Sequence, residues 1–329
     1  MSAQFAAIRA ESPNTTKQTY ANNPLVGAIF DAYIADRSSA LAYKRCKHPR
    51  ALVISLMKAR ELWGKMPIDE FRVGSKPRVK AAVQSWLAPS PESGQKAVSL
   101  GTVRKRCTIM RAAFSFAVSE ELIERGQEPV FELPPNPPPR ERYVDQKEEL
   151  PRLLKELDRA PFHLRLAGLL MFITGQRIGA ILALEWEHVD FDKRIIFFRD
   201  TEAAADRSKK RRVNQPMDDE LFEILTQAKE RATCARVVEW NGRGCKTVFP
   251  GFKRLLRRAG LGDVRLHDLR RSSATYVHAG TGGSDEAAAS HIGDSVEMAR
   301  KVYIQEDPKV RLPGIEASSK ALREARKAG

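Results

Sequence analysis

Patterns that bind structural metals or form disulfides are missing from this sequence. Its four cysteines, Cys46, Cys107, Cys234 and Cys245, include no CxxC pair, and its six histidines do not cluster. A structural zinc site needs four such ligands at close spacing, and a disulfide framework needs a higher density of cysteines. We therefore expect a protein of the reduced cytoplasmic compartment without a structural metal, and the sequence gives no sign of a cofactor.

Long apolar runs are also missing. The most apolar stretch, residues 166–173, is far shorter than the roughly 20 residues of a membrane-spanning helix. The N-terminus lacks the continuous apolar segment of a secretion signal. We expect no membrane partner, and we interpret residues 1–23, which are rich in Ser, Thr, Asn and Ala, as a flexible arm or, alternatively, an organelle transit peptide.

The sequence has fewer acidic residues than basic ones. The chain has 56 Lys and Arg against 41 Asp and Glu, which gives a formal net charge of +15. A basic surface attracts polyanions and releases counterions when it binds nucleic acid. Nucleic acid is therefore the predicted partner, and a basic surface without such a partner is the alternative.

The first part of the chain, residues 24–130, predicts a helical domain. Apolar residues recur at spacings of three and four in the segments 25–37, 49–66, 78–87 and 101–123. Basic residues gather at two places in this domain, and they are either contacts to DNA phosphates or solvated faces. These candidate phosphate contacts are Lys44, Arg45, Lys47, Arg104, Lys105 and Arg106.

A proline-rich linker, residues 131–141, separates the first domain from the second. Its five prolines between Pro134 and Pro139 forbid helix and favour an extended, semi-rigid segment. We predict a second domain at 142–310, with helices from Lys147 to Leu184. Alternation over 186–198, a turn at 190–193 and a strand at 211–216 predict a small antiparallel sheet. Residues 311–329 form a tail that either docks on a neighbouring subunit or is solvated.

Three short motifs in the second domain carry groups that bind or attack phosphate. Arg177 follows a Thr-Gly pair, His267 and Arg270 are three residues apart and would share a helical face, and Tyr303 lies between two apolar residues. Guanidiniums donate charge-assisted, bidentate hydrogen bonds to phosphate oxygens, and a phenol becomes a nucleophile when a neighbour removes its proton. Each motif alone is common, so their order along the chain matters.

In that order, with a lysine between Arg177 and His267, these residues resemble the tyrosine recombinase, or phage integrase, family. The matching words are TGxRxxxxLxLxW at 174–186, HDLRRSSAT at 267–275 and ARKVY ending at Tyr303. The resemblance implies a mainly α fold with a small antiparallel β-sheet: a helical (SAM-like) core-binding domain and a mixed α/β catalytic domain.

The resemblance also implies an activity. Such a protein carries out site-specific recombination for a mobile element, and it cuts and rejoins double-stranded DNA through a 3′-phosphotyrosine on Tyr303. Two to four copies bind inverted half-sites, which implies a nucleoid-associated homo-oligomer on DNA. The family lysine lies in the hairpin occupied here by DRSKKRRVNQPM; Lys209 is the first candidate and Lys210 the second, with Arg211 and Arg212 as further phosphate contacts.

The sequence departs from the family pattern at two positions. Asp294 stands where the family usually has a histidine or tryptophan nine residues before the tyrosine, and Ala180 stands where the family often has an acid. A carboxylate would repel the scissile phosphate, so Asp294 must bind an arginine, stay protonated or point away. Our hypothesis is that His291 supplies the missing imidazole and that Asp294, on the same helical face, orients it.

Two other functions fit the same residues. A DNA-binding regulator could retain the fold without strand exchange, which Asp294 favours, and a relaxing enzyme like topoisomerase IB could use the same chemistry without sequence specificity. All three bind DNA, so binding assays do not separate them. A covalent adduct on a nicked substrate separates the two enzymes from the regulator, and relaxation of an arbitrary supercoiled plasmid then indicates the topoisomerase.

Overall fold

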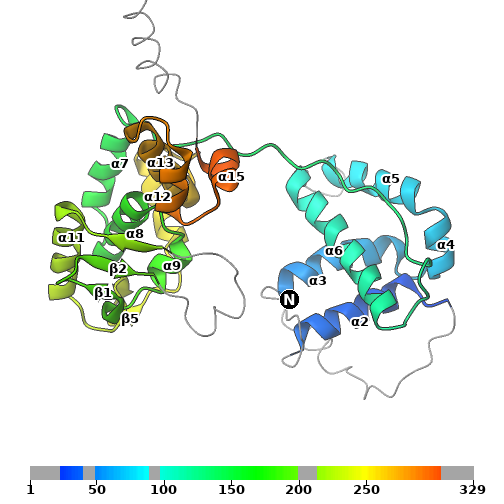
Figure 1. Cartoon of the computed structure of the whole chain (residues 1–329). Coiled ribbons are helices and arrows are strands. Elements are labelled where there is room, and N and C mark those ends of the chain that lie inside the picture. Colours follow the sequence, from blue (N-terminus) through cyan, green and yellow to red (C-terminus); the bar gives the residue numbers. More distant parts are fainter. Residues whose placement is uncertain (1–22, 40–48, 89–96, 199–212, 305–329) are drawn as a thin grey trace, which may run out of the picture. The chain divides into compact units, whose positions relative to one another are not determined.

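The computed structural model describes residues 23–39, 49–88, 97–198 and 213–304. Contacts within the chain divide it into two compact units that meet between residues 138 and 139. This boundary falls inside the proline-rich segment 131–141. Figure 1 shows the helices and strands of both units.

The first unit is a bundle of helices around an aromatic core. The rings of Phe30, Phe71 and Phe114 pack together, with centroids 5.6 Å apart for the pair 30–114 and 5.8 Å apart for the pair 71–114. The side-chain oxygen of Ser99 caps the longest helix by accepting a hydrogen bond from the amide of Thr102. The helices are α2 (Val26–Ser38), α3 (Pro49–Trp63), α4 (Ile68–Val73), α5 (Ser75–Leu87) and α6 (Leu100–Ser119).

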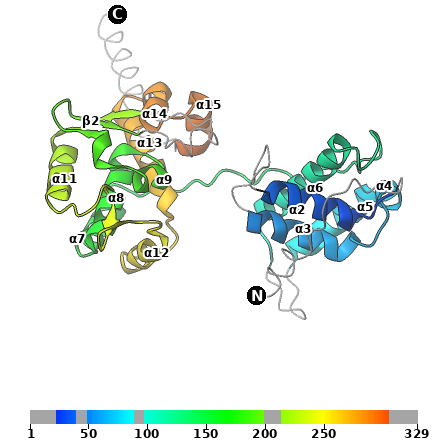
Figure 2. The ribbon, with the colours of Figure 1, turned by 90° about the horizontal axis from the view of Figure 1, so that it is seen from below.

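The second unit is also mainly helical. Helix α13 lies beside α8, α12 and α14 and contacts the segment that ends at Tyr303. Figure 2 shows the same helices from below. The helices are α7 (Glu149–Asp158), α8 (Phe162–Thr174), α9 (Ile178–Leu182), α11 (Asp219–Glu230), α12 (Phe249–Arg258), α13 (Leu266–Gly280), α14 (Asp285–Ile292) and α15 (Val296–Met298).

The predicted antiparallel sheet is confirmed. Strands β1 (Val189–Asp190), β2 (Ile195–Phe197) and β3 (Asn214–Pro216) pair in the order β1-β2-β3, and Ile196 of the central strand faces both Val189 and Gln215. The sheet begins later than predicted, because Trp186–His188 forms a 3₁₀ turn, η1. A second hairpin, β4 (Glu239–Trp240) and β5 (Arg243–Gly244), was not predicted.

The last described segment has an uncommon geometry. Residues Ala299–Tyr303 form a single π-helical turn, η2, directly after α15, and such turns occur often at functional sites. Tyr303 packs there in a small core with Ala274 of α13 and Ile292 of α14. Among the described helices, none has the length and apolar character to cross a membrane.

Candidate active site

Arg177 lies at a break between two helices. Helix α8 ends at Thr174, because Gly175 directly after it has a left-handed backbone (φ 61°), and Arg177 is the residue that precedes α9. Its side chain is about one quarter exposed. The Thr-Gly pair of the sequence motif is thus the turn that brings Arg177 out of the helix.

Arg270 is completely buried on α13. One of its terminal nitrogens, Nη1, donates to the carbonyl of Gly175 at 2.6 Å and to the carbonyl of Ile292 at 2.9 Å. These bonds join α13 to the turn before Arg177 and to the end of α14. The guanidinium is therefore fixed by backbone groups from two distant parts of the chain.

Both arginines bind Asp294. Its Oδ2 atom accepts from Nη2 of Arg177 at 2.5 Å and from Nη2 of Arg270 at 3.1 Å. The sequence left three alternatives for Asp294: binding an arginine, staying protonated or pointing away. The structure shows the first of these, and Asp294 binds two arginines instead of one. The guanidiniums thus converge on a single oxygen, as they would on an oxygen of a phosphate.

Tyr303 lies against Arg270 and His267. The guanidinium carbon of Arg270 is 4.8 Å from the centre of the phenol ring, and the ring centres of His267 and Tyr303 are 5.5 Å apart in an edge-on arrangement. Tyr303 is 5 % exposed. The structure therefore brings together four predicted site residues, Arg177, His267, Arg270 and Tyr303. Arg177 joins this group because it and Arg270 both bind Asp294.

The local environment shifts the pKa of two of these residues downward. Burial lowers the pKa of Arg270, and the nearby charge of Arg177 adds to this effect, while Tyr303 and Asp294 oppose it. His267 is partly exposed, yet its pKa lies below the ordinary value, first because protein atoms displace water from the ring and then because Arg270 and Arg271 are close. His267 is therefore neutral at pH 7.

Arg271, which was not among the residues predicted from the sequence, holds the tyrosine segment in place. Its Nε donates to the carbonyl of Val302 at 2.9 Å, and its Nη1 donates to the buried carboxylate of Asp268 at 2.6 Å. Asp268 also accepts from Arg140 at 3.1 Å. The only signal in the sequence was the second arginine of the word HDLRRSSAT.

His291 is held by residues other than the one expected. The amide of Gln215 on β3 donates to its Nδ1 at 3.3 Å, and its Nε2 is 2.8 Å from the hydroxyl of Ser273. Burial and the charge of Arg270 lower its pKa to about 4, so the ring is neutral and its Nε2 carries the proton. Within the described residues Asp294 binds the two arginines and not His291, so the expectation that Asp294 orients His291 is wrong. That His291 supplies the missing imidazole stays a prediction.

The remaining predicted residues lie mostly outside the described part of the chain. This applies to Lys44, Arg45, Lys47 and the hairpin residues Lys209, Lys210, Arg211 and Arg212. In α6, Lys105 is exposed and Arg104 donates to the carbonyl of Pro134. Arg106 is buried and lies 5.2 Å from the ring centre of Trp86, so the structure places it in the core and not on a basic surface.

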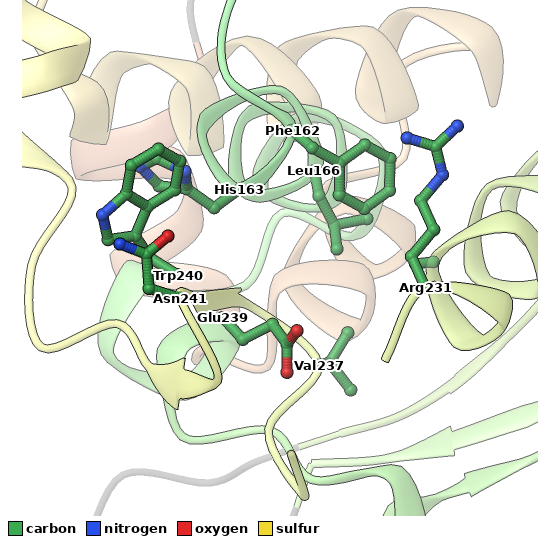
Figure 3. A pocket seen from close by; sticks show the side chains of 9 residues that line it. Phe162, His163, Leu166, Arg231, Val237, Glu239, Trp240 and Asn241 are labelled. Atoms are coloured by element: carbon green, nitrogen blue, oxygen red, sulfur yellow. The ribbon is translucent and has the colours of Figure 1, made fainter. Parts of the chain in front are cut away.

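Two other places in the second unit could suggest a ligand. A cavity of about 180 Å³ between the start of α8, the end of α11 and β4 is lined by His163 and Trp240, whose rings are 4.5 Å apart, and by none of the predicted site residues (Figure 3). Glu185, Glu187 and His188 offer three grouped ligand atoms, but Glu185 is already paired with Arg236 at 3.0 Å. Neither place gives an argument for a metal or cofactor.

The arrangement around Asp294 combines a site for an anion with a group that can act as a nucleophile. Two positive groups converge where a phosphate could bind, and a phenol with a neutral imidazole beside it can act as a nucleophile.

The fold of the chain is similar to that of integrases of known structure. A lambda integrase dimer bound to a COC' core site matches with a TM-score of 0.64 and 18% identity, over 91% of this chain and 84% of that chain. The Tn1549 transposon integrase in complex with transposon right end DNA matches with a TM-score of 0.64 and 17% identity, over 89% of this chain and 99% of that chain.

Sequence comparison gives the family. No curated protein sequence matches the chain significantly. The model of the phage integrase family, however, matches residues 144–308, which is half of the chain and spans Arg177, Arg270 and Tyr303. The chain therefore belongs to the phage integrase family of tyrosine recombinases.

Proposed function

We propose that this protein is a site-specific DNA recombinase that cuts and rejoins DNA through a covalent bond to Tyr303. The observation that carries the proposal is the convergence of Arg177 and Arg270 on one oxygen, with the Tyr303 ring 4.8 Å from the guanidinium of Arg270. The net charge of +15 supports DNA as the partner.

The proposed reaction is an exchange of two phosphate esters. The Tyr303 oxygen attacks the scissile phosphorus, the bond from phosphorus to the 5′ oxygen breaks, and the DNA is left as a 3′-phosphotyrosine. Arg177 and Arg270 stabilise the negative charge that develops on the phosphate oxygens, and losing one such donor typically costs about 2.7–4 kcal/mol of barrier. The released 5′ hydroxyl reverses the step, so no ATP is needed.

Two protons must move in this step. His267 is the nearest candidate to accept the proton of the phenol, because its ring is neutral and packs against Tyr303. A bound phosphate offsets the charges of Arg270 and Arg271, which raises the pKa of His267 and makes it a better base. Lys209, or else Lys210, supplies the proton of the leaving 5′ hydroxyl.

We propose that the protein works on double-stranded DNA as a dimer to a tetramer. Structures of lambda integrase show a dimer bound to a core site and a tetramer bound to a Holliday junction, and this chain shares their fold. In the proposed arrangement, the helical unit that ends at Pro138 is the core-binding domain and the unit that begins at Pro139 is the catalytic domain.

A DNA-binding regulator without strand exchange is the second candidate. Asp294 favours it, since its carboxylate is bound to both arginines that would hold the phosphate. The enzyme requires that the phosphate replaces this carboxylate on the two arginines.

A nicked suicide duplex carrying the target site separates the two functions. An enzyme forms a covalent protein–DNA adduct that is stable to denaturation and is abolished by Tyr303→Phe. Tyr276→Phe is the matched control, because Tyr276 lies on α13 and its hydroxyl donates to the carbonyl of Val144. Tight, specific binding without any adduct would contradict the proposed enzyme and favour the regulator.

A further inference from the structure

Arg270 has only one edge left for a ligand. Its Nη1 is used by the carbonyls of Gly175 and Ile292, at 2.6 and 2.9 Å. The other edge of the guanidinium carries Nε and Nη2, whose N–H groups point the same way and can bind two oxygens side by side. Asp294 lies at this edge, since its Oδ2 accepts from Nη2.

Asp294 fills this edge only partly. The Nε of Arg270 is buried and has no hydrogen-bond partner among the described residues. The one carboxylate oxygen that reaches the guanidinium is shared with Arg177. A tetrahedral oxyanion with several oxygens can satisfy Nε, Nη2 and Arg177 together, so it is a better ligand for this pair of arginines than the carboxylate.

Asp294 can also leave without moving a helix. It lies in the short turn between α14 and α15, after Gly293 in a left-handed conformation (φ 67°) and before Ser295, which caps α15. Its side chain is 18 % exposed, whereas Arg270 is not exposed at all. The buried guanidinium is thus the fixed partner, and the carboxylate at the edge of solvent is the group that can be displaced.

From these contacts we infer that Asp294 is an internal competitor of the phosphate: its carboxylate occupies the oxyanion site formed by Arg177 and Arg270 until a phosphodiester displaces it. The inference builds on the proposed function, because it takes this site to be the place of the scissile phosphate. Because the carboxylate must be displaced first, a phosphate binds Arg177 and Arg270 only if it binds them more tightly than Asp294 does. An isolated anion or a poorly placed backbone phosphate does not bind tightly enough.

Binding of inorganic sulfate tests the inference without requiring catalysis. The melting temperature of the full chain is followed against sulfate concentration, with ionic strength held constant by chloride. We expect Asp294→Asn to bind sulfate about tenfold or more tightly than the wild type, because the competing charge is gone. Asp294→His, which places the family's residue there, is the second variant in case the amide impairs folding.

Two control variants show whether the effect comes from the arginine pair. Asp219→Asn removes the same charge from a side chain that is 95 % exposed and should leave sulfate affinity unchanged. Adding Arg177→Ala to Asp294→Asn removes half of the site and should cancel the gain.

Equal sulfate affinity in the wild type and Asp294→Asn overturns the inference. Weaker affinity in the variant also overturns it, because Asp294 would then support the arginines instead of competing for them. The adduct assay tests the recombinase separately. A gain in sulfate affinity without any Tyr303 adduct refutes the recombinase but supports Asp294 as the competitor of phosphate. An adduct without the gain supports the recombinase but refutes the competition by Asp294.

Discussion

Gly175 is the position where adding one methyl group should damage the site most. Its backbone is left-handed (φ 61°), and a Cβ atom there would lie 2.9 Å from Cγ2 of Ile292 and 3.1 Å from Oγ of Ser273. The left-handed conformation costs a residue other than glycine about 1–2 kcal/mol, and an extra carbon in a packed core costs about 1–3 kcal/mol. Gly175→Ala should therefore lower the free energy of unfolding by about 2–5 kcal/mol.

Differential scanning calorimetry of the full chain measures this loss. In a unit of this size, 1 kcal/mol lowers the melting temperature by about 2–4 °C, so the transition of the second unit should fall by roughly 4–20 °C. Because the Gly175 carbonyl binds Arg270, cleavage should fall as well.

Gly179→Ala is the matched control, since a Cβ there meets no atom within 4 Å and the residue lies inside α9. Alanine is favoured over glycine within a helix by up to about 1 kcal/mol, so this variant should melt at the same temperature or slightly higher. The reasoning is refuted if the two variants melt together.

Three further changes have defined outcomes. Arg271→Met removes the donor to the Val302 carbonyl and should lower the rate of adduct formation by about tenfold or more, as for a lost charge-assisted hydrogen bond, with DNA affinity in a gel-shift assay unchanged. The folded pKa of His291 is about 4 against about 6.5 when unfolded, so the unfolded chain binds more protons between these values and stability falls as the pH drops through this range. Thermal melts at pH 6.5 and pH 4.5 should show a smaller fall for His291→Asn. Lys209→Met or Lys210→Met should block cleavage of ordinary DNA. In a DNA whose bridging 5′ oxygen is replaced by sulfur, the leaving group is a thiolate that needs no proton. This DNA should restore cleavage only in the variant that lost the proton donor.

Much of the fold follows from local patterns in the sequence. The three-and-four spacing of apolar residues predicted helices where α2, α3, α5 and α6 lie, and alternation predicted the sheet formed by β1, β2 and β3. The β4–β5 hairpin was missed although its Asn241-Gly242 pair, with φ of 51° and 73°, is a typical hairpin turn. Its strands are two residues long, too short for an alternating pattern.

Residues that act through long-range contacts were harder to predict. Arg177, His267, Arg270 and Tyr303 could be predicted because each lies in a short, contiguous sequence motif and the motifs follow one another in the order typical of the family. Arg271 binds a carbonyl 31 positions away, and no local pattern encodes such a contact. Gln215 and Ser273 were missed for the same reason, since they meet His291 from β3 and α13.

The wrong pairing of His291 with Asp294 has a local cause. Residues three apart share a face only while the helix continues. Helix α14 ends at Ile292, and Gly293 turns the chain so that the amide of Asp294 donates to the carbonyl of Ala289 at 3.0 Å, the pattern of a glycine-terminated helix. His291 therefore stays on the helix with Ser273, and Asp294 turns to the arginines. Since glycine is the residue that adopts this conformation most readily, replacing Gly293 should separate Asp294 from both guanidiniums even with the carboxylate intact.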